Sequence, residues 1–263
     1  NEGEWVLLNG NQTALMFVYY LITRWKELGK INGKEYIVKT IVTTETIKTI
    51  AERNGVEMYD VYTGFKWIAN VMRENEGKKN YIGGGEESYG FLCEDFVRDK
   101  DAVSACVILA EIAAWAKDQG LSLYQLLQKI YVEYGFSKEK GISVVKKGKS
   151  GAEEIEAMMK KFRENPLTEI AGSKVTYFYD YSTLKGKDYA ENETVTLDMP
   201  TTSNVLQYFT EDNTKVSIRP SGTEPKIKFY CEVHSKVKSI DELPEAEKAA
   251  EEKINQIKAS LGI

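Results

Sequence analysis

The sequence predicts an α/β sheet domain with flanking helices over residues 1–135, followed by an α+β domain with a mostly antiparallel sheet over residues 136–263. Strand-like and helical segments alternate in the first part, whereas strand-like segments follow one another in the second. Residues 135–150 between them are rich in Gly, Lys and Ser, which is typical of a domain boundary. A chain of 263 residues is long enough for two domains that each bury a core.

The first domain is predicted from alternating periodicities. Apolar residues recur at helical spacing after Asn9 and Asn11, either of which can cap the first helix. The next segment is rich in Ile, Val, Thr and Tyr, as a strand should be. Gly55 ends one later helix, and Asp101 can cap another. In chain order the predicted elements are a helix over 11–27, a strand over 35–44, a helix over 45–54, a strand over 56–62, a helix over 65–76, a short strand at 81–82, and helices over 102–119 and 121–134.

The second domain is predicted to begin and end with helices that enclose a series of strands. The last helix carries Leu243-Pro244 in its first turn, where proline is well tolerated. The predicted elements are a helix over 152–164, strands over 175–181, 193–199, 205–209, 215–219 and 226–233, and a helix over 241–261.

Composition excludes several classes of protein. The formal net charge of −5 argues against a nucleic-acid partner, so an anionic ligand must be held by a local basic site. No apolar stretch is long enough to cross a bilayer and no signal peptide is evident, which predicts a cytoplasmic protein without a membrane partner. The three cysteines lack metal-ligand or redox spacing and are expected as reduced thiols. His234 is the only histidine, which argues against a His-based triad or a multi-His metal centre.

The segment 219–225 has the composition of a phosphate-binding turn between two strands. Arg219 offers a planar fork to two phosphate oxygens, Ser221 and Thr223 offer hydroxyl donors, and Gly222 lets a backbone N–H approach an anion. Prolines on both sides stiffen the turn. An ordinary Pro/Gly connection between strands is the alternative interpretation of this segment alone.

A second segment, 83–90, is a glycine-bracketed loop with two carboxylates and a hydroxyl. Glu86 can accept hydrogen bonds from sugar hydroxyls, and Ser88 can both donate and accept, which suits a polyol. A solvated acidic turn is the alternative. The carboxylate pair of a glycosidase is disfavoured, because the adjacent Glu86 and Glu87 point in divergent directions.

Two shorter segments add basic residues. Thr63 and Lys66 lie where a predicted strand gives way to a helix, so a hydroxyl, an ammonium group and helix N-terminal amides could face an anion. Lys100 lies just before the helix predicted at 102. The alternatives are a helix cap with a surface lysine in the first case and an exposed charge cluster over 98–101 in the second.

These segments, in this order, resemble the phosphoglucomutase/phosphomannomutase family of the α-D-phosphohexomutase superfamily. Residues 85–90 resemble the sugar loop of the family's third domain, and residues 219–225 resemble the phosphate loop of its fourth domain. Residues 8–13 resemble the start of the third domain, 63–66 its threonine-lysine loop, and 98–101 the segment that supplies a ligand lysine. The resemblance covers essentially the whole chain and implies a third and a fourth family domain.

The resemblance implies a site residue by residue. It assigns sugar hydroxyls to Glu86 and Ser88, and it lets Lys228 add charge to the pocket. The Glu-Glu-Ser form of the sugar loop implies glucose or mannose phosphate as ligand. The remaining implied contacts are Thr63, Lys66 and Lys100 for the substrate and Arg219, Ser221, Gly222 and Thr223 for the non-reacting phosphate.

The resemblance also implies a reaction, in which a phosphoryl group moves between the C1 and C6 oxygens of a hexose. The family uses an enzyme-bound phosphoserine and an aspartate-rich Mg²⁺ loop, and no segment of this chain resembles either element. We therefore expect a C-terminal fragment, inactive alone, without catalytic or metal residues of its own. Its partners would be hexose phosphate and the missing N-terminal domains of the same polypeptide. Mg²⁺ and hexose 1,6-bisphosphate would be cofactors of the full-length parent, and none would be bound by the fragment alone. The alternative is a stand-alone sugar-phosphate-binding or regulatory module.

Overall fold

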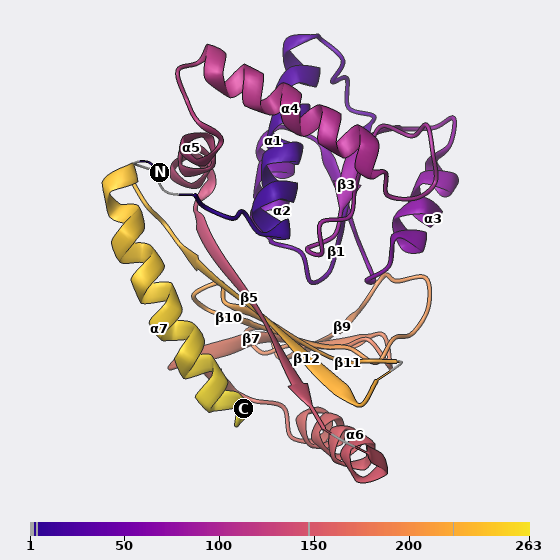
Figure 1. Cartoon of the computed structure of the whole chain (residues 1–263). Coiled ribbons are helices and arrows are strands. Elements are labelled where there is room, and N and C mark those ends of the chain that lie inside the picture. The colour runs from indigo at the N-terminus through magenta and orange to yellow at the C-terminus, as the bar shows by residue number, and fades with distance from the viewer. Residues whose placement is uncertain (1–2, 4, 147, 223) are drawn as a thin grey trace. The chain divides into compact units, whose positions relative to one another are not determined.

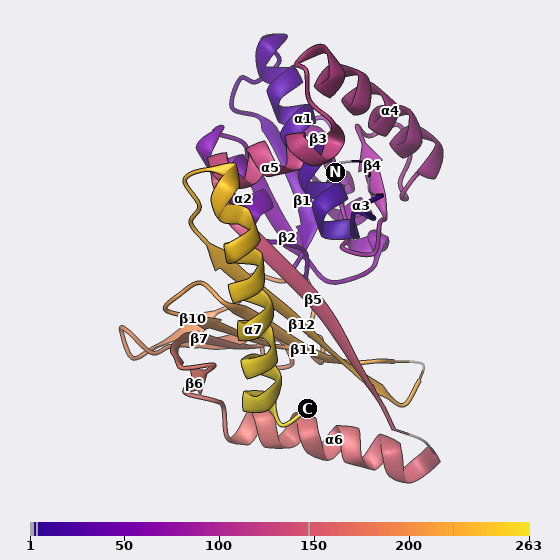
Figure 2. The same cartoon turned by 60° about the vertical axis from the view of Figure 1, so that its left-hand side comes forward.

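The computed structural model describes residues 1–263 except 1, 2, 4, 147 and 223, and it divides into two compact units (Figures 1 and 2). Unit 1 comprises residues 1–136 together with the segment 236–243. Unit 2 comprises residues 137–235 and 244–263. The chain therefore passes from unit 2 back into unit 1 before its last helix.

Unit 1 is built on a four-stranded sheet of order β2-β1-β3-β4. Strand β1 pairs in parallel with both β2 and β3, and β4 pairs antiparallel to β3. This confirms the predicted α/β domain with flanking helices. Its elements are α1 (Gly10–Glu27), β1 (Glu35–Thr40), α2 (Thr46–Arg53), β2 (Glu57–Val61), α3 (Phe65–Asn75), β3 (Asn80–Gly85), β4 (Phe91–Cys93), α4 (Ala102–Asp118), α5 (Leu123–Tyr134) and the 3₁₀ helix η1 (Ile240–Glu242).

Caps and core contacts explain why these helices begin and lie where they do. Asn9 caps α1 in a capping box with Gln12, so it is Asn9 and not Asn11 that starts the helix. Asp101 accepts from the Ser104 N–H and caps α4, as predicted. On one face of the sheet α3 packs against strand side chains, and α1 lies on the other face, where Leu21 is close to Gly83. The α3 core comprises Tyr36, Val38, Val61, Phe65, Ile68, Met72, Tyr81 and Leu92.

Unit 2 is built on a sheet of order β5-β12-β11-β10-β7-β8-β9, with β6 paired to β7. The neighbours from β12 to β9 are antiparallel, which confirms the predicted mostly antiparallel domain. Helix α6 packs on this sheet, where the Phe162 ring contacts the Phe229 ring of β12 in an edge-to-face arrangement. The elements are β5 (Phe136–Val145), α6 (Gly148–Glu164), β6 (Glu169–Ile170), β7 (Ser173–Asp180), β8 (Lys185–Asp188), β9 (Glu193–Thr196), β10 (Leu206–Thr210), β11 (Lys215–Pro220), β12 (Lys226–Ser235) and α7 (Leu243–Leu261).

Several predicted boundaries were wrong. The strand predicted over 35–44 ends at Thr40, because the chain turns there and the Thr43 N–H donates to the Thr40 carbonyl. The strand predicted at 81–82 extends to Gly85, because backbone pairing with β1 and β4 continues through its three glycines. Strands β4, β5, β6 and β8 were not predicted, since they are short or rich in Gly and Lys. The helix predicted from 152 begins at Gly148.

Within the described part of the chain, no helix combines the length and the apolar character needed to span a membrane.

Candidate functional site

The carboxylate of Glu86 lies at the carboxyl end of β3 and is held in place by the start of α3. Its side chain is 8% exposed, and its Oε1 accepts a hydrogen bond of 2.8 Å from the Gly64 N–H. Gly64 has φ 110° and is the residue before α3, so this amide reaches the carboxylate through a backbone conformation that only glycine adopts without strain. One carboxylate oxygen is thus positioned by the fold, while Oε2 lies over Gly90.

Lys100 lies beside this carboxylate. A Cβ added to Gly90 would be 2.9 Å from Lys100 Cδ and 3.0 Å from Glu86 Oε2, so both side chains border the same bare backbone. The Lys100 ammonium is 5.8 Å from the centre of the Phe65 ring and 3.3 Å from Asp99 Oδ1. Carboxylate and ammonium groups at one place can accept from one hydroxyl and donate to another. We call Gly64, Glu86, Gly90 and Lys100 the Glu86 cluster.

The loop that carries Glu86 is fixed by its surroundings. The Glu86 N–H donates to the Gly90 carbonyl at 2.8 Å and closes the loop, in which Tyr89 has φ 71°. Glu87 turns away from Glu86, because its Oε2 accepts from Thr40 Oγ1 at 3.2 Å. The two carboxylates thus diverge, as expected from their adjacency. Ser88 is exposed at the tip of the loop.

The N-terminus of α1 packs directly under this loop. A Cβ on Gly10 would lie 1.9 Å from the Glu87 carbonyl oxygen and 2.8 Å from the Tyr89 nitrogen. The Tyr89 hydroxyl donates to the Leu8 carbonyl at 3.1 Å. Residues 8–10 therefore form the support on which the loop rests.

A buried lysine lies on the strand next to the loop. Lys39 is 1% exposed and pairs in register with Gly85. Its Nζ is 2.8 Å from Glu45 and 2.7 Å from Asp60, so two carboxylates compensate its charge. The signal that sequence reasoning overlooked was a lysine directly after the apolar run 36–38 of a predicted strand.

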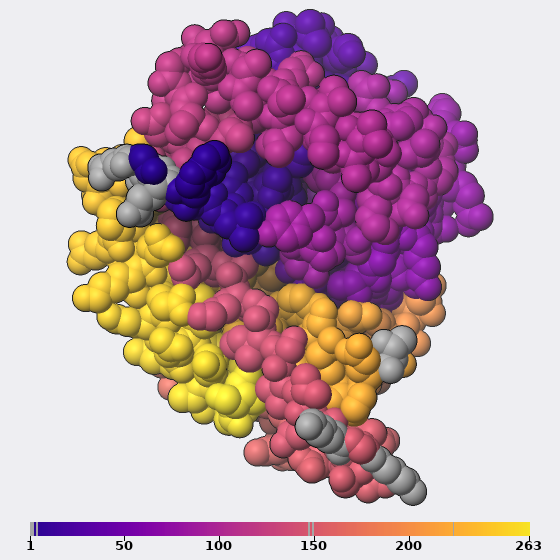
Figure 3. Space-filling view, viewed as in Figure 1, coloured from indigo at the N-terminus to yellow at the C-terminus, as the bar shows by residue number. Residues whose placement is uncertain are grey.

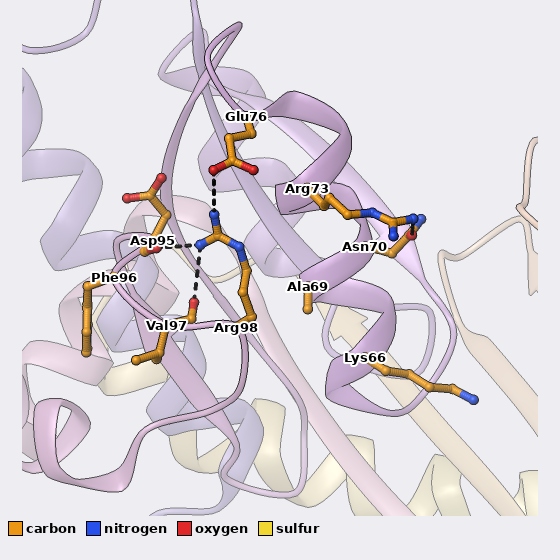
Figure 4. A pocket seen from close by; sticks show the side chains of 9 residues that line it. All are labelled: Lys66, Ala69, Asn70, Arg73, Glu76, Asp95, Phe96, Val97 and Arg98. Atoms are coloured by element: carbon orange, nitrogen blue, oxygen red, sulfur yellow. Dashed lines mark hydrogen bonds and ion pairs between the residues drawn. The ribbon is translucent and has the colours of Figure 1, made fainter.

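Thr63 and Lys66 were predicted to act together at the start of α3. Thr63 is half-buried and precedes the residue whose amide binds Glu86, and it makes no side-chain cap for α3. Lys66 is exposed, with its Nζ 5.1 Å from the centre of the Trp67 ring. It lines a groove of about 620 Å³ with Arg73 and Arg98 (Figure 4). The contacts of Lys66 are thus to this groove rather than to the Glu86 cluster.

The groove contains both signs of charge. Figure 4 shows Arg98 between α3 and the loop 94–100. Arg98 forms an ion pair with the Glu76 carboxylate and donates hydrogen bonds to the carbonyls of Asp95 and Val97. The charge of Arg98 is therefore used to hold the loop 94–100 against the end of α3.

The segment 219–225, predicted to bind phosphate, lies in unit 2 at the hairpin between β11 and β12. Arg219 and Lys228 are direct partners in the register of the two strands, so both side chains project from the same face of the sheet. Both are half-buried, and neither forms an ion pair with another described residue. Like charges directly opposite one another on a sheet are unfavourable. An anion bound between them would remove that repulsion.

The hairpin loop beyond this pair is closed by backbone bonds. The Ser221 N–H donates to the Lys226 carbonyl at 2.7 Å, and the Lys226 N–H donates to the Glu224 carbonyl at 2.7 Å. Lys226 also forms a 2.7 Å ion pair with Glu224, which lowers the pKa of that carboxyl and keeps both charges together. Gly222 is exposed and has open space where a Cβ would be. Thr223 lies outside the described residues.

The same face of β11 and β12 carries further polar side chains. Lys215 pairs with Glu232 at 2.9 Å, and His234 contacts the same carboxylate at 2.8 Å. Burial by itself raises the pKa of Glu232, but the neighbouring charges of Lys215 and His234 outweigh it and hold that pKa below its ordinary value. Burial opposes protonation of His234, yet Glu232 raises the pKa of His234. By the register of the two strands, Lys215 and Glu232 lie on the same face of the sheet as Arg219 and Lys228.

The described residues contain no group of three His, Cys, Asp or Glu side chains that could hold a metal ion. By this criterion the described residues do not fit a Mg²⁺ site.

Sequence reasoning named the charged members of both sites and missed the glycines that shape one of them. Gly64, Gly90 and Gly10 determine where Glu86 and its loop lie. Their only signal in the sequence was that glycines flank the charged motifs.

Comparisons with known proteins match two successive segments of the chain. Residues 9–134 match the family model "Phosphoglucomutase/phosphomannomutase, alpha/beta/alpha domain III", and residues 143–250 match "Phosphoglucomutase/phosphomannomutase, C-terminal domain". A phosphoglucomutase of Staphylococcus haemolyticus is 33% identical over 233 residues, which are 89% of this chain and 41% of that protein. A phosphoglucomutase of Staphylococcus aureus is 37% identical over 229 residues, 87% of this chain and 40% of that protein.

Solved structures show the same fold at low identity. Parafusin, a phosphoglucomutase from Paramecium, has a TM-score of 0.57 and 17% identity over 89% of this chain and 38% of its own. A putative phosphomannomutase from Thermus thermophilus has a TM-score of 0.55 and 18% identity over 92% of this chain and 41% of its own. The chain thus spans about two fifths of the length of these relatives.

Proposed function

The chain belongs to the phosphoglucomutase/phosphomannomutase family, and on that basis we propose that it binds a hexose phosphate for reversible interconversion of the 1-phosphate and the 6-phosphate. The observation that carries this proposal is the cross-strand pair of Arg219 and Lys228 below an open glycine turn. Two unpaired cations side by side cost stability in a protein that binds no anion. They suit a ligand with a phosphate group.

In this proposal the phosphate that does not react is bound in unit 2. Arg219 donates two parallel hydrogen bonds to it, and Lys228 acts as a point charge. The Gly222 amide and the hydroxyls of Ser221 and Thr223 complete the set. Because the Glu224–Lys226 ion pair is already formed, the negative charge of Glu224 is largely balanced by Lys226.

The sugar is bound by the Glu86 cluster in unit 1. Glu86 accepts from sugar hydroxyls through the oxygen that the Gly64 amide leaves available, and Ser88 supplies a second polar contact. Lys100 lies near enough to the Glu86 carboxylate to donate to the same ligand. Thr63 and Lys66 complete the substrate contacts only if the start of α3 or the Lys66 side chain reorients on binding.

Turnover requires more than these residues. Phosphoryl transfer depends on a positioned nucleophile and on stabilisation of the transferring group by metal-bound charge. We infer that the phosphoserine, the Mg²⁺ ligands and the bisphosphate-dependent chemistry belong to further domains of the same polypeptide, and that the chain alone is inactive. The parent protein would then be an intramolecular phosphotransferase of the isomerase class.

Calorimetric titration with glucose 1,6-bisphosphate tests the binding proposal. We expect Arg219→Ala to weaken binding at least about tenfold, since a charged hydrogen-bond pair contributes about 1.5–3 kcal/mol. Glu86→Gln should weaken binding by a similar factor, because it replaces an ionised acceptor by an amide. Lys248→Ala is the matched control, because Lys248 is an exposed cation on α7.

Two outcomes would contradict the proposal. Equal affinities of the Arg219→Ala and Lys248→Ala variants would show that the hairpin is not the phosphate site. Mutase turnover by the purified chain above the background of a Glu86→Gln preparation would show that no further domain is needed.

A further inference from the structure

Helix α4 carries many more apolar residues than it buries in unit 1. Of its 17 residues only Glu111, Lys117 and Asp118 are charged, yet only Ile112 and Ala116 are fully buried. A helix that is apolar on all sides is normally enclosed by protein or lipid. Since no described helix qualifies as a membrane span, a protein surface is the cover to consider.

The exposed part of α4 forms one continuous face. Val103 is 74% exposed and Val107 is 61% exposed, and they are one helical turn apart. Cys106, Ala110 and Ala114 are exposed on the same side. We call these five residues the α4 face. Figure 1 shows helix α4 at the front of unit 1, with no other helix or strand of that unit in front of it. The space-filling view from the same side shows the magenta surface of this part of the chain at the front (Figure 3).

The composition of the α4 face suits another protein element. Its small side chains allow a second helix or sheet to approach closely, and its two valines provide surface to bury. Single exposed apolar residues are common on proteins, but a contiguous apolar face marks an interaction site. Of the charged residues of α4, Lys117 and Asp118 lie at its C-terminal end, and the Glu111 carboxylate beside the face accepts a hydrogen bond of 2.6 Å from the Tyr20 hydroxyl of α1.

The share of the family polypeptide that this chain represents indicates what covers it. The chain spans 41% and 40% of two phosphoglucomutase relatives, so most of their length lies outside the matched region. We propose that the α4 face is the surface on which this chain docks the remaining domains of its own polypeptide. This inference rests on the proposed function in one respect, that activity requires further domains.

Cys106 provides a built-in probe of this proposal. It is exposed and lies on the α4 face, whereas Cys93 and Cys231 are buried. Burial raises the pKa of each of these two thiols to about 12, so they should not react in the folded protein. The rate at which a maleimide or disulfide reagent modifies Cys106 therefore measures how accessible the α4 face is.

The experiment compares Cys106 labelling in the isolated chain and in the complete gene product. We expect rapid labelling in the chain, and labelling at least about 100-fold slower in the complete protein, because opening of a docked interface of about 3 kcal/mol must precede reaction. Equal rates in the two proteins overturn the proposal. Protection in the isolated chain that increases with protein concentration would identify a second copy as the cover and would also overturn it. A complete gene product that contains no further domains would also overturn the proposal.

A pair of variants gives a second readout. In the complete protein, Val107→Glu should lower the thermal midpoint by at least about 3 °C and restore rapid Cys106 labelling, while leaving the isolated chain unchanged. Val145→Glu is the matched control, since Val145 is 62% exposed but lies on β5. Labelling reports docking and not turnover. A failure of this inference is therefore distinguishable from a failure of the proposed function, which is measured by ligand titration.

Discussion

The support of the loop 86–90 by α1 leads to a prediction for Gly10, a residue without a functional group of its own. Gly10 begins α1, and its Cα faces the backbone of the loop that carries Glu86. In Gly10→Ala the new methyl group would lie 1.9 Å from the Glu87 carbonyl oxygen and 2.6 Å from the Glu87 carbonyl carbon. Both contacts are with backbone, so no side-chain rotation can relieve them.

The size of the effect follows from these distances. A carbon atom does not approach a carbonyl oxygen more closely than 3.0 Å, so helix and loop must separate by roughly 1 Å. Overpacking of this kind costs about 1–3 kcal/mol of stability, and alanine in place of glycine returns up to about 1 kcal/mol of helix propensity. We expect a net loss of about 1–2 kcal/mol. If the proposed function is right, a misplacement of Glu86 by about 1 Å should reduce kcat/KM of the complete protein by about 100-fold.

The four tryptophans make the assay specific to one unit. Trp5, Trp25, Trp67 and Trp115 all belong to unit 1, so tryptophan fluorescence in a urea titration follows the unfolding of that unit. Gly141→Ala is the matched control, because Gly141 has no atom within 4 Å of the added Cβ and no positive φ. We expect Gly141→Ala to leave the stability of the chain unchanged when unfolding is followed by circular dichroism.

The reasoning would be refuted by a Gly10→Ala protein whose unit 1 unfolds at the same urea concentration as the unmodified chain and whose bisphosphate affinity is unchanged. That result would mean that the loop moves at no cost and that its position against α1 does not matter for ligand binding.

Three further predictions concern unit 2. Gly222→Ala should leave the fold unchanged, because the added Cβ meets nothing within 4 Å. It should weaken bisphosphate binding about fivefold in calorimetry, because the methyl group obstructs the Gly222 N–H. Unchanged affinity would count against a contact between this N–H and the ligand. Lys228→Ala should raise the stability of the ligand-free chain by about 0.2–1 kcal/mol in urea titrations, because it removes a like-charge neighbour of Arg219. Its affinity for phosphate should fall. A loss of stability would contradict a repulsion between Arg219 and Lys228. The lowered pKa of Glu232 contributes stability above its ordinary value of 4.5, and the raised pKa of His234 contributes stability below its ordinary value of 6.5. Circular dichroism from about pH 3 to about pH 9 should therefore show greatest stability between those values. Stability should decline at higher pH as His234 loses its proton, and below pH 4.5 because Glu232 then takes up a proton in the unfolded chain while it stays ionised in the folded one. His234→Gln should abolish the alkaline decline, and a decline that persists in this variant would assign it to another group.

Much of the fold could be predicted because local periodicity and tertiary packing agree. The helices at 10–27 and 102–118 carry caps at Asn9 and Asp101 that the sequence displays directly. Strand β5 was missed because its residues 136–145 are rich in Lys, Ser and Gly, and its pairing with β12 comes from a segment about 90 residues later. Such a strand is specified by its partner rather than by its own propensity.

The candidate site divides in the same way. Motif composition led to the prediction of Glu86 and Arg219, because a carboxylate can accept from sugar hydroxyls and a guanidinium can donate two hydrogen bonds to a phosphate. It could not place Lys66, whose side chain lies along Trp67, since the direction of a side chain at the start of a helix depends on the packing of that helix.

The sequence by itself determined the order of the α-helices, the fold class and the chemical groups that we propose bind a sugar phosphate. Only the tertiary structure decided that Lys228 lies opposite Arg219, that the Gly64 amide holds Glu86, and that the Glu87 backbone rests on Gly10. Each of these is a contact between residues separated in the chain. Register and close approach of backbones depend on how whole elements pack, and no local pattern of residues encodes them.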